Sequence, residues 1–509
     1  MYKTLLINPR SVYYCESEKS NPSHYAGLLS ILSVLDDKNY SVFLLDCVIS
    51  SNPEKDIEIA INSLKGEELL VGFSVMTSQI PHASFLSDYI RKKFPKSKII
   101  WGGAHPTLFP EAVLESGKAD FVCIGEGEYA VLSLLEALNH NKPTGNIPGI
   151  LELKNMSNNI LSKQPAHSLD NLPFFNYEPT NYKQAMLRTF SENGVFEPLR
   201  YAVILTGVGC PYKCTFCINS NKNLYLGRFR RKSAERIIEE IEFQIKKYSI
   251  ECFEFLDDNF FIDKNNVKKF LSLIEEKKLN FKWFTNIRAD YFREDYVNKD
   301  FIKRLEKNGC QRLAIGAESG SQRILDKLKK SIKIEQILNS AKTLADSNIK
   351  VTYSFMMGLP GEEKSDVDMT LSLIEKIRKI KKDANFIGPQ IFRPYPGGEL
   401  YGECVEKYGY RPPRSLSDWE NNLSLFSGYE DLEKLTWIKD KKFIRKVSFY
   451  LEFANLQIKN LSLNRVKKII LYAVKYISLF RIKNHFWGLN LEMFFVNLYK
   501  KNFRKNFSF

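Results

Sequence analysis

Three cysteines stand close together near the middle of the chain, at Cys210, Cys214 and Cys217. Three residues separate the first pair and two separate the second. Thiolates crowded in this way suit a soft metal ion or an iron–sulfur cluster. Three ligands leave one cluster iron without a protein thiolate, so that iron can bind a substrate or a cofactor. The alternatives are a structural zinc site with a distant fourth ligand, or three ordinary buried cysteines.

Alternating strands and helices surround these cysteines from about residue 199 to residue 401. The apolar run directly before them indicates a buried strand, and a glycine-containing turn follows it. The expected strands are residues 201–205, 252–256, 282–286, 312–316, 351–356 and 384–392. Six such units predict a partial (β/α)6 barrel of the TIM type, whose active site lies at the carboxyl ends of the strands.

Polar or glycine-rich segments follow five of these strands. They are Asp257-Asp258-Asn259-Phe260, Asn286-Ile287-Arg288-Ala289-Asp290, Gly316-Ala317-Glu318-Ser319-Gly320, Gly358-Leu359-Pro360-Gly361-Glu362 and Pro394-Tyr395-Pro396-Gly397-Gly398. An Asp or Asn there can simply cap a helix, and we expect one of Asp257 and Asp258 to do only that. Arg288 can pair with a bound carboxylate or with a neighbouring loop, and both readings stay open.

The cysteine spacing, with Phe216 directly before the last cysteine, resembles the signature of the radical S-adenosylmethionine (SAM) enzymes. In that family the cysteines hold a [4Fe-4S] cluster whose open iron chelates the amino and carboxylate groups of SAM. One electron then cleaves SAM to a 5′-deoxyadenosyl radical. The resemblance implies that Cys210, Cys214 and Cys217 are the metal ligands, with Phe216 beside the cofactor. It also implies a reducing partner of the flavodoxin or ferredoxin type.

The strand-end segments acquire roles from the same resemblance. Asp258 would handle the amino group of SAM or of the substrate, and Arg288 would pair with the SAM carboxylate. Glu318 and Ser319 would hydrogen-bond the ribose and carboxylate ends of SAM, and Gly358 would allow close packing beside adenine.

The first 140 residues show a second alternation of strands and helices. The expected strands are residues 3–7, 41–45, 69–74, 98–101 and 120–124. This pattern predicts a five-stranded, doubly wound parallel sheet of the Rossmann or flavodoxin type. Ligands of such sheets bind at the carboxyl ends of the strands. The candidate contacts there are Asn8, Ser74, Thr77, Gly102, Gly103, Gly125, Glu126 and Gly127.

In front of the cysteine motif, this domain resembles the cobalamin-binding domain fused to many radical SAM enzymes. The segments that carry the resemblance are Gly72-Phe73-Ser74, Trp101-Gly102-Gly103-Ala104-His105-Pro106 and Gly125-Glu126-Gly127-Glu128. The Asp-x-His-x-x-Gly motif that supplies a histidine to cobalt in other B12 proteins is absent, so we expect no cobalt ligand from it. His105 is either a loop residue or a metal ligand. A degenerate domain that binds nothing is the alternative for the whole segment.

Two further regions complete the predicted organisation. Residues 141–198 are expected to be a linker, with a hairpin over residues 149–161. Residues 402–509 are expected to be helical, basic and aromatic. From residue 441 onward, 15 Lys or Arg residues face only Glu452 and Glu492, so nearly all of the net charge of +15 lies there.

The basic tail leaves three interpretations open. Cationic and aromatic helices suit a peripheral membrane contact with anionic lipid, which would favour a lipid-like substrate. Nucleic acid is a less favoured anionic partner. The third interpretation is a helical cap packed on the barrel. The start of the chain lacks an apolar signal segment and the cysteines are odd in number, so we expect a cytoplasmic protein. If the tail binds lipid, the inner face of the membrane is its expected site.

The combined resemblance predicts a cobalamin-dependent radical SAM enzyme that acts on a small-molecule or lipid-like substrate. Its favoured activity is C-methyltransfer, in which methylcobalamin alkylates an unactivated carbon through a radical. The first alternative uses the same cofactors for cyclisation, rearrangement or oxidation. A second alternative, of another class, is a non-catalytic cobalamin or redox sensor.

Overall fold

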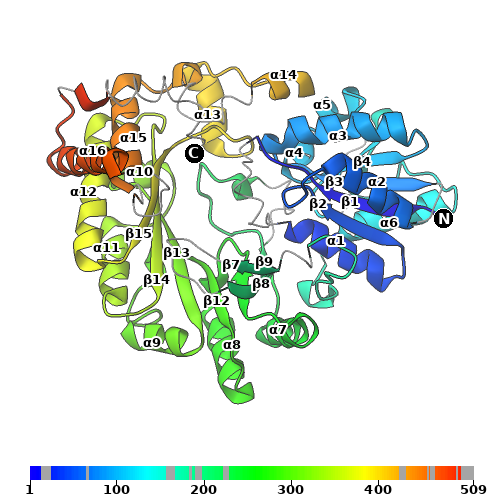
Figure 1. Cartoon of the computed structure of the whole chain (residues 1–509), viewed down its shortest axis with the longest axis horizontal. Helices are drawn as coiled ribbons and strands as arrows, with labels where there is room; N and C mark the ends of the chain where they lie inside the picture. Colours follow the sequence, from blue (N-terminus) through cyan, green and yellow to red (C-terminus); the bar gives the residue numbers. More distant parts are fainter. Residues whose placement is uncertain are drawn as a thin grey trace.

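The computed structural model describes residues 1–12, 25–64, 68–155, 167–182, 186–189, 198–221, 229–422, 432–455, 458, 465–488 and 491–493. Within these ranges the chain forms two large β-sheets, each covered by helices, and a C-terminal group of helices (Figure 1). Both sheets are mainly parallel, as the α/β alternation of the sequence predicts.

The N-terminal sheet has six strands in the order β2-β1-β3-β4-β5-β6. They are β1 (Lys3–Asn8), β2 (Val42–Asp46), β3 (Leu69–Ser74), β4 (Lys98–Gly102), β5 (Phe121–Cys123) and β6 (Ile150–Leu151). Only β6 is antiparallel to its neighbour. Leu5, Leu6 and Ile7 of the interior strand β1 are buried, as in a strand covered on both faces. The predicted doubly wound sheet is confirmed, with one strand more than expected.

Helices connect these strands and cover both faces of the sheet (Figure 1). They are α1 (Ala26–Asp37), α2 (Pro53–Leu64), α3 (Ile80–Lys93), α4 (Ala104–Leu108), α5 (Pro110–Glu115) and α6 (Glu128–Asn139). Helices α1 and α6 pack against each other. Alternating helix placement leaves the carboxyl ends of β3, β4 and β5 accessible at one edge, where ligands of such sheets bind.

The second sheet has six parallel strands and an antiparallel edge strand, in the order β15-β14-β13-β12-β11-β8-β7. The strands are β7 (Leu187–Thr189), β8 (Pro198–Ile204), β11 (Cys252–Phe255), β12 (Lys282–Ile287), β13 (Cys310–Glu318), β14 (Lys350–Met357) and β15 (Asn385–Ile391). Strand β15 does not pair with β7 or β8, so the sheet is a partial barrel. This confirms the predicted (β/α)6 fold.

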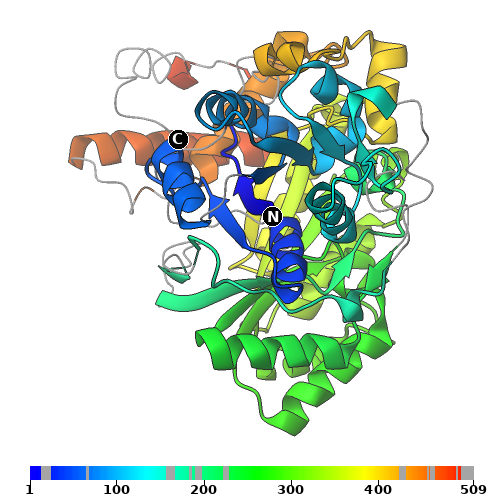
Figure 2. The ribbon, with the colours of Figure 1, turned by 90° about the vertical axis from the view of Figure 1, so that its right-hand side faces the viewer.

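The barrel helices lie on the outer side of this sheet. They are α7 (Ala234–Tyr248), α8 (Lys264–Lys277), α9 (Lys299–Lys307), α10 (Gln322–Lys327), α11 (Ile334–Leu344) and α12 (Lys364–Ile380). Helix α7 shows why they form: Ser233 caps its first turn, and Ile237, Ile238 and Ile241 recur at helical spacing on its buried side. The N-terminal unit lies in front of the barrel strands in Figure 2.

The segment expected to be a plain linker takes part in both sheets. Strand β6 extends the N-terminal sheet and β7 extends the barrel sheet. The amide of Asn176 donates to Ser33 of α1, and the amide of Tyr177 donates to Tyr248 of α7. The described parts of the connector therefore bridge the two units. Part of the hairpin expected over residues 149–161 lies outside the described residues.

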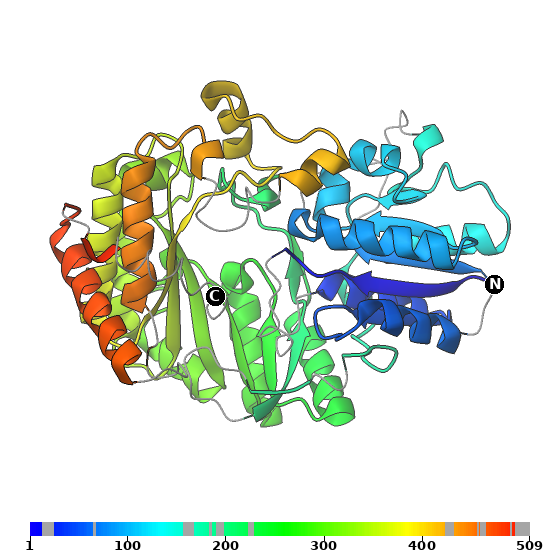
Figure 3. The same ribbon diagram turned by 45° about the horizontal axis from the view of Figure 1, so that its top comes forward.

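The C-terminal helices are α13 (Glu399–Tyr408), α14 (Leu416–Asn421), α15 (Lys441–Asn455) and α16 (Arg465–Asn484). Helices α15 and α16 lie side by side on the outside of the barrel (Figure 3), and α16 also contacts α12. Helix α14 reaches the N-terminal unit, where it contacts α3. Among the described helices, none is long and apolar enough to cross a membrane.

Candidate active site

The cysteine loop starts at the carboxyl end of β8. Gly209 has a φ of +76° and turns the chain into Cys210, a conformation that a residue with a side chain adopts only with strain. The amide of Cys217 donates to the carbonyl of Cys214 at 3.1 Å, which curls the second half of the loop. Cys214 is buried, and the other two thiols are partly exposed.

The donor set of this loop fits a cluster with an open iron. Burial raises the pKa of the Cys210 thiol and raises that of Cys217 to about 11, so iron has to displace protons when it binds. Across the described part of the chain, no three His, Cys, Asp or Glu side chains converge closely enough to hold a single metal ion. A cluster needs less convergence than a single ion, because each thiolate binds a different iron.

Asp257 and Asp258 follow β11 and have different surroundings. Asp257 accepts hydrogen bonds from the amides of Thr206 and Gly207 at 2.9 and 3.0 Å, so it fixes the start of the cysteine loop. Burial raises its pKa to about 6. Burial likewise raises the pKa of Asp258 to about 6, against the effect of a hydrogen bond from Asn219 in the turn after Cys217. Asp258 therefore lies beside the end of the cysteine loop.

Arg288 supports the cysteine loop from the next strand. Its guanidinium lies 3.6 Å from the centroid of the Tyr212 ring. It donates to the Asp290 carboxylate at 2.9 Å and to the Lys330 carbonyl at 2.7 Å. Although burial acts to lower it, the Asp290 carboxylate raises the pKa of Arg288. The loop contact that the sequence left open is therefore formed, and the predicted SAM contact remains a prediction.

A buried ion pair lies next to Phe216. Glu318 has a φ of +62° at the end of β13, and its carboxylate accepts a hydrogen bond from Lys330 at 2.8 Å. The Lys330 ammonium lies 5.7 Å from the centroid of the Phe216 ring. A Cβ at Gly316 would come within 2.4 Å of the Glu318 carboxylate, so a side chain at this position would displace the ion pair. No motif in the sequence identifies Lys330 as a site residue.

Ser319 and Gly358 lie in other surroundings. The Ser319 side chain is fully buried, and its hydroxyl accepts from the Ser321 amide at 3.1 Å and lies 3.3 Å from the Thr370 hydroxyl of α12. Gly358 has a φ of +68°, and its carbonyl accepts from the indole of Trp437 at 2.8 Å. Both residues thus contact outer or C-terminal elements, and their predicted contacts with SAM remain untested.

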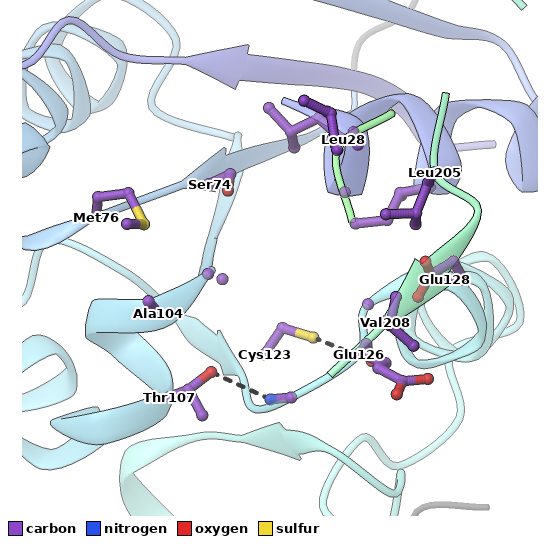
Figure 4. A pocket seen from close by; sticks show the side chains of 18 of the residues that line it. Leu28, Ser74, Met76, Ala104, Thr107, Cys123, Glu126, Glu128, Leu205 and Val208 are labelled. Atoms are coloured by element: carbon purple, nitrogen blue, oxygen red, sulfur yellow. Dashed lines mark hydrogen bonds between the residues drawn. The ribbon is translucent and has the colours of Figure 1, made fainter. Parts of the chain in front are cut away.

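A cavity of about 610 Å³ lies between the N-terminal sheet and the barrel. Ser74, Gly102, Gly103, Gly125, Glu126 and Gly127 line it from the strand ends of the N-terminal unit, as Figure 4 shows for Ser74 and Glu126. From the barrel it is lined by Leu205, Val208, Ile218, Asn219, Leu256 and Asn286, among others. The cavity is thus shared by the strand ends of one unit and the cysteine-loop region of the other.

Two candidate contacts lie beside this cavity without lining it. Asn8 donates to Asp46 at 2.8 Å and accepts from Gln79 at 3.1 Å. Thr77 lies 3.3 Å from the Nδ1 of His105. Both side chains are buried and brace the loops at the sheet edge. No histidine is found among the described residues that line the cavity.

Local contacts fix the backbone of two loops at the cavity. Gly103 has a φ of +95°, and a Cβ there would meet the Val75 amide nitrogen at 2.8 Å. Thr107 accepts a hydrogen bond from the Gly125 amide at 3.1 Å, which fixes the loop after β5 (Figure 4). The positive φ and the close contact with Val75 therefore require glycine at position 103 for the turn after β4.

Two family matches cover the two units. Residues 20–135 match the B12 binding domain, and residues 204–374 match the Radical SAM superfamily. The first match includes the strand ends that line the cavity, and the second includes the cysteine loop.

Curated relatives align with most of the chain. An uncharacterized methyltransferase of Pyrococcus horikoshii is 27% identical over 74% of this chain and 78% of its own length. The cytidylyl-2-hydroxyethylphosphonate methyltransferase of Streptomyces wedmorensis is 25% identical over 81% of this chain and 84% of its own. An anaerobic magnesium-protoporphyrin IX monomethyl ester cyclase of Synechocystis is 24% identical over 81% and 79%.

Solved structures show the same fold. The cobalamin-dependent SAM radical enzyme OxsB, with aqua-cobalamin and SAM bound, superposes with a TM-score of 0.64 at 16% identity, over 98% of this chain and 75% of its own. The radical SAM methyltransferase TsrM of Kitasatospora setae, with cobalamin and a [4Fe-4S] cluster bound, gives 0.61 at 15% identity, over 81% and 77%.

Proposed function

This chain belongs to the radical SAM enzymes that carry an N-terminal B12-binding domain, and we propose that it transfers a methyl group to an unactivated carbon of a small-molecule substrate. One observation carries the proposal: a single cavity of about 610 Å³ is lined both by the strand ends of the B12-binding unit and by residues next to the cysteine loop. A methyl carrier and a radical source must face the same substrate atom, and a shared cavity permits this.

The chain supplies ligands and supports for three cofactors in this proposal. Cys210, Cys214 and Cys217 would hold a [4Fe-4S] cluster, and the strand-end glycines Gly102 and Gly103 would admit cobalamin. When bound, the cluster would supply the electron that cleaves SAM to methionine and a 5′-deoxyadenosyl radical, and cobalamin would supply the methyl group. The relatives named as methyltransferases, and cofactors bound in OxsB and TsrM, support this assignment.

The remaining residues would orient the cysteine loop and enclose the site beside it. Asp257 and Arg288 fix the two sides of the cysteine loop through the bonds described above. Lys330 and Glu318 place a buried charge pair beside Phe216, where the zwitterionic end of SAM would need complementary charges. A reducing protein of the flavodoxin or ferredoxin type would deliver the electron.

Anaerobic reconstitution tests the proposal. We expect about four irons and one cobalamin per chain, and formation of 5′-deoxyadenosine from SAM under a strong reductant. Cys214→Ala should lose iron and SAM cleavage, whereas Cys310→Ala should keep both, because Cys310 is buried in β13 away from the loop. A cluster that forms without cobalamin would contradict the role of the N-terminal unit.

The identity of the product separates two activities. The Synechocystis relative is a cyclase, which favours cyclisation or oxidation with the same cofactors as the second candidate function. A product heavier than the substrate by one methylene unit supports methyl transfer. A product without added carbon, such as one lighter by two hydrogen atoms, supports the second candidate. Failure to form 5′-deoxyadenosine in a fully reconstituted protein would instead support a non-catalytic sensor.

Lipid contact by the C-terminal region is a separate part of the proposal. Helix α16 exposes Ile469, Tyr476 and Phe480, which recur at helical spacing on one side. Exposed apolar and aromatic side chains on a basic helix are typical of an interfacial helix. Flotation of the full-length protein with anionic vesicles at physiological salt should show binding, and its absence would reject lipid contact.

A further inference from the structure

An ion pair joins the loop at the B12-binding unit to a strand of the barrel unit. Glu126 lies between β5 and α6 and lines the shared cavity. Arg230 begins the short strand β10 (Arg230–Arg231) and donates through Nη2 to the Glu126 carboxylate. The two side chains are only 16% and 17% exposed. This pair is therefore much more enclosed than an ordinary surface salt bridge.

Arg230 has a second contact with the same side. Its Nη1 donates to the carbonyl oxygen of His167 in the connector. The His167 ring lies 4.0 Å from the ring of Tyr129 in the first turn of α6, measured between centroids. The guanidinium thus binds the start of α6 directly through Glu126 and indirectly through His167. A planar fork of donors suits such a divided contact better than a lysine would.

The pairing of strand β10 connects Arg230 to the segment that enters the cysteine loop. It pairs antiparallel with β9 (Gly207–Val208), and Arg230 lies opposite Val208. Val208 lines the shared cavity and precedes Cys210 by two residues. Gly207 is tied to Asp257 at 3.0 Å. A displacement of Arg230 would therefore move the backbone that enters the cysteine loop.

The Arg230–Glu126 pair lies in an enclosed site, so its loss should disturb the surrounding structure. Burial raises the pKa of Glu126, whereas the Arg230 guanidinium acts to lower it, so Arg230 stabilises the charged form of this carboxyl group. An enclosed charge that loses its partner disturbs its surroundings more than an exposed one does. Among the described residues that line the cavity, Arg230 is absent, so it can act there only through its contacts.

We propose that Arg230 and Glu126 form a positioning contact that fixes the loop of residues 124–127, at the proposed cobalamin site, against the cysteine loop. The proposal rests on the function proposed above and adds a residue pair that couples the two cofactor sites. Neither residue takes part in the chemistry. Arg230 holds the Glu126 loop, and the β9–β10 pairing carries that constraint to the residues before Cys210.

Cobalamin affinity and backbone exchange test this contact. Arg230→Gln and Glu126→Gln should each weaken binding of hydroxocobalamin to the full-length protein by about tenfold. In the protein without cofactors, both should speed hydrogen–deuterium exchange in residues 124–129 and also in residues 207–210. The reversed pair, Arg230→Glu with Glu126→Arg, should recover part of both losses.

Arg231→Gln is the matched control. Arg231 is the neighbour of Arg230 in β10, and its partner Asp263 precedes α8 within the barrel unit. This variant should leave cobalamin affinity and exchange at residues 124–129 unchanged. The proposal is overturned if Arg231→Gln has the same effects as Arg230→Gln, or if only Glu126→Gln weakens cobalamin binding. If the wild-type chain binds no cobalamin, the proposed function fails, while the exchange measurement still decides whether the contact couples the loops.

Discussion

Lys330 and Glu318 form an enclosed ion pair beside the cysteine loop, with side chains 11% and 9% exposed. Two charges at such a site interact strongly, because little water screens them. Removing one partner leaves the other charge enclosed and unpaired, which is much more destabilising than losing a surface pair. The pair therefore contributes to the rigidity of the wall next to Phe216.

Lys330→Met should reduce the free energy of unfolding by about 3 kcal/mol, because it leaves the Glu318 carboxylate without its partner. Lys329→Met is the matched control, since Lys329 pairs with Glu399 while 54% and 61% of the two side chains are exposed. Its loss should cost less than about 1 kcal/mol. Denaturant unfolding of the cofactor-free protein measures both values. Equal losses would contradict the special role of the enclosed pair.

Sequence patterns identify some candidate site residues much better than others. The three cysteines are identified as candidate ligands by their close spacing, and their role as cluster ligands remains a prediction. Lys330 is not identified in this way, because it stands in Lys329-Lys330-Ser331 and no pattern indicates which lysine turns inward. Ser319 and Thr77 show the reverse difficulty: both follow strands as site residues do, yet their hydroxyls contact Thr370 and His105.

Elements with a clear period were predicted within a few residues, and elements without one were not. The apolar runs of β3 and β13 are long enough to indicate strands. Strands β6 and β7 have two and three residues, too few for any periodic signal. Their place in the sheets depends on tertiary pairing alone, so the sequence predicts only a linker for this segment.

Helix α14 illustrates a contact between distant elements that no local pattern predicts. Its Trp419 is fully buried, and its ring lies 5.2 Å from the rings of both His105 and Phe109 in the N-terminal unit. Burial among these rings lowers the pKa of His105 to about 3. His105 is therefore a buried packing residue at the contact with α14, and it is not among the residues that line the shared cavity.

This contact should make the fold sensitive to acid. His105 binds a proton less readily in the folded chain than in the unfolded chain, where its pKa is about 6.5. Its stabilising contribution is thus complete above pH 6.5 and is lost as the pH falls toward 3. Between pH 7.5 and pH 5, His105 should account for about 2 kcal/mol of the loss in unfolding free energy.

Denaturant unfolding at these two pH values measures the effect. His105→Leu should show a smaller loss than the wild type, because the variant has no group to protonate at this position. His140→Asn is the control, since His140 is exposed and its replacement should leave the pH dependence unchanged. The same pH dependence in His105→Leu as in the wild type would reject this origin of acid sensitivity.

At the scale of the whole molecule, the two units enclose one cavity between them. The sequence predicts each unit from its alternating strands and helices, and it predicts that ligands bind at strand ends. It does not predict that the strand ends of β3 and β4 face Leu205 and Val208, because no sequence period encodes the docking of two units. The connector, α14 and the Arg230–Glu126 pair hold the two units in that arrangement.

A ligand that fills a shared cavity should protect both of its walls. Adding hydroxocobalamin without SAM should therefore slow hydrogen–deuterium exchange at residues 100–107 and also at residues 205–219, because each range contributes to the lining. Helix α9 lies on the outside of the barrel and should keep its exchange rates, which makes it an internal control. At a ligand concentration about 100 times the dissociation constant, binding should add about 2.7 kcal/mol to the free energy of unfolding. Protection confined to residues 100–107 would mean that cobalamin contacts the N-terminal unit alone, and the shared cavity would then not bring the methyl carrier to the cysteine loop.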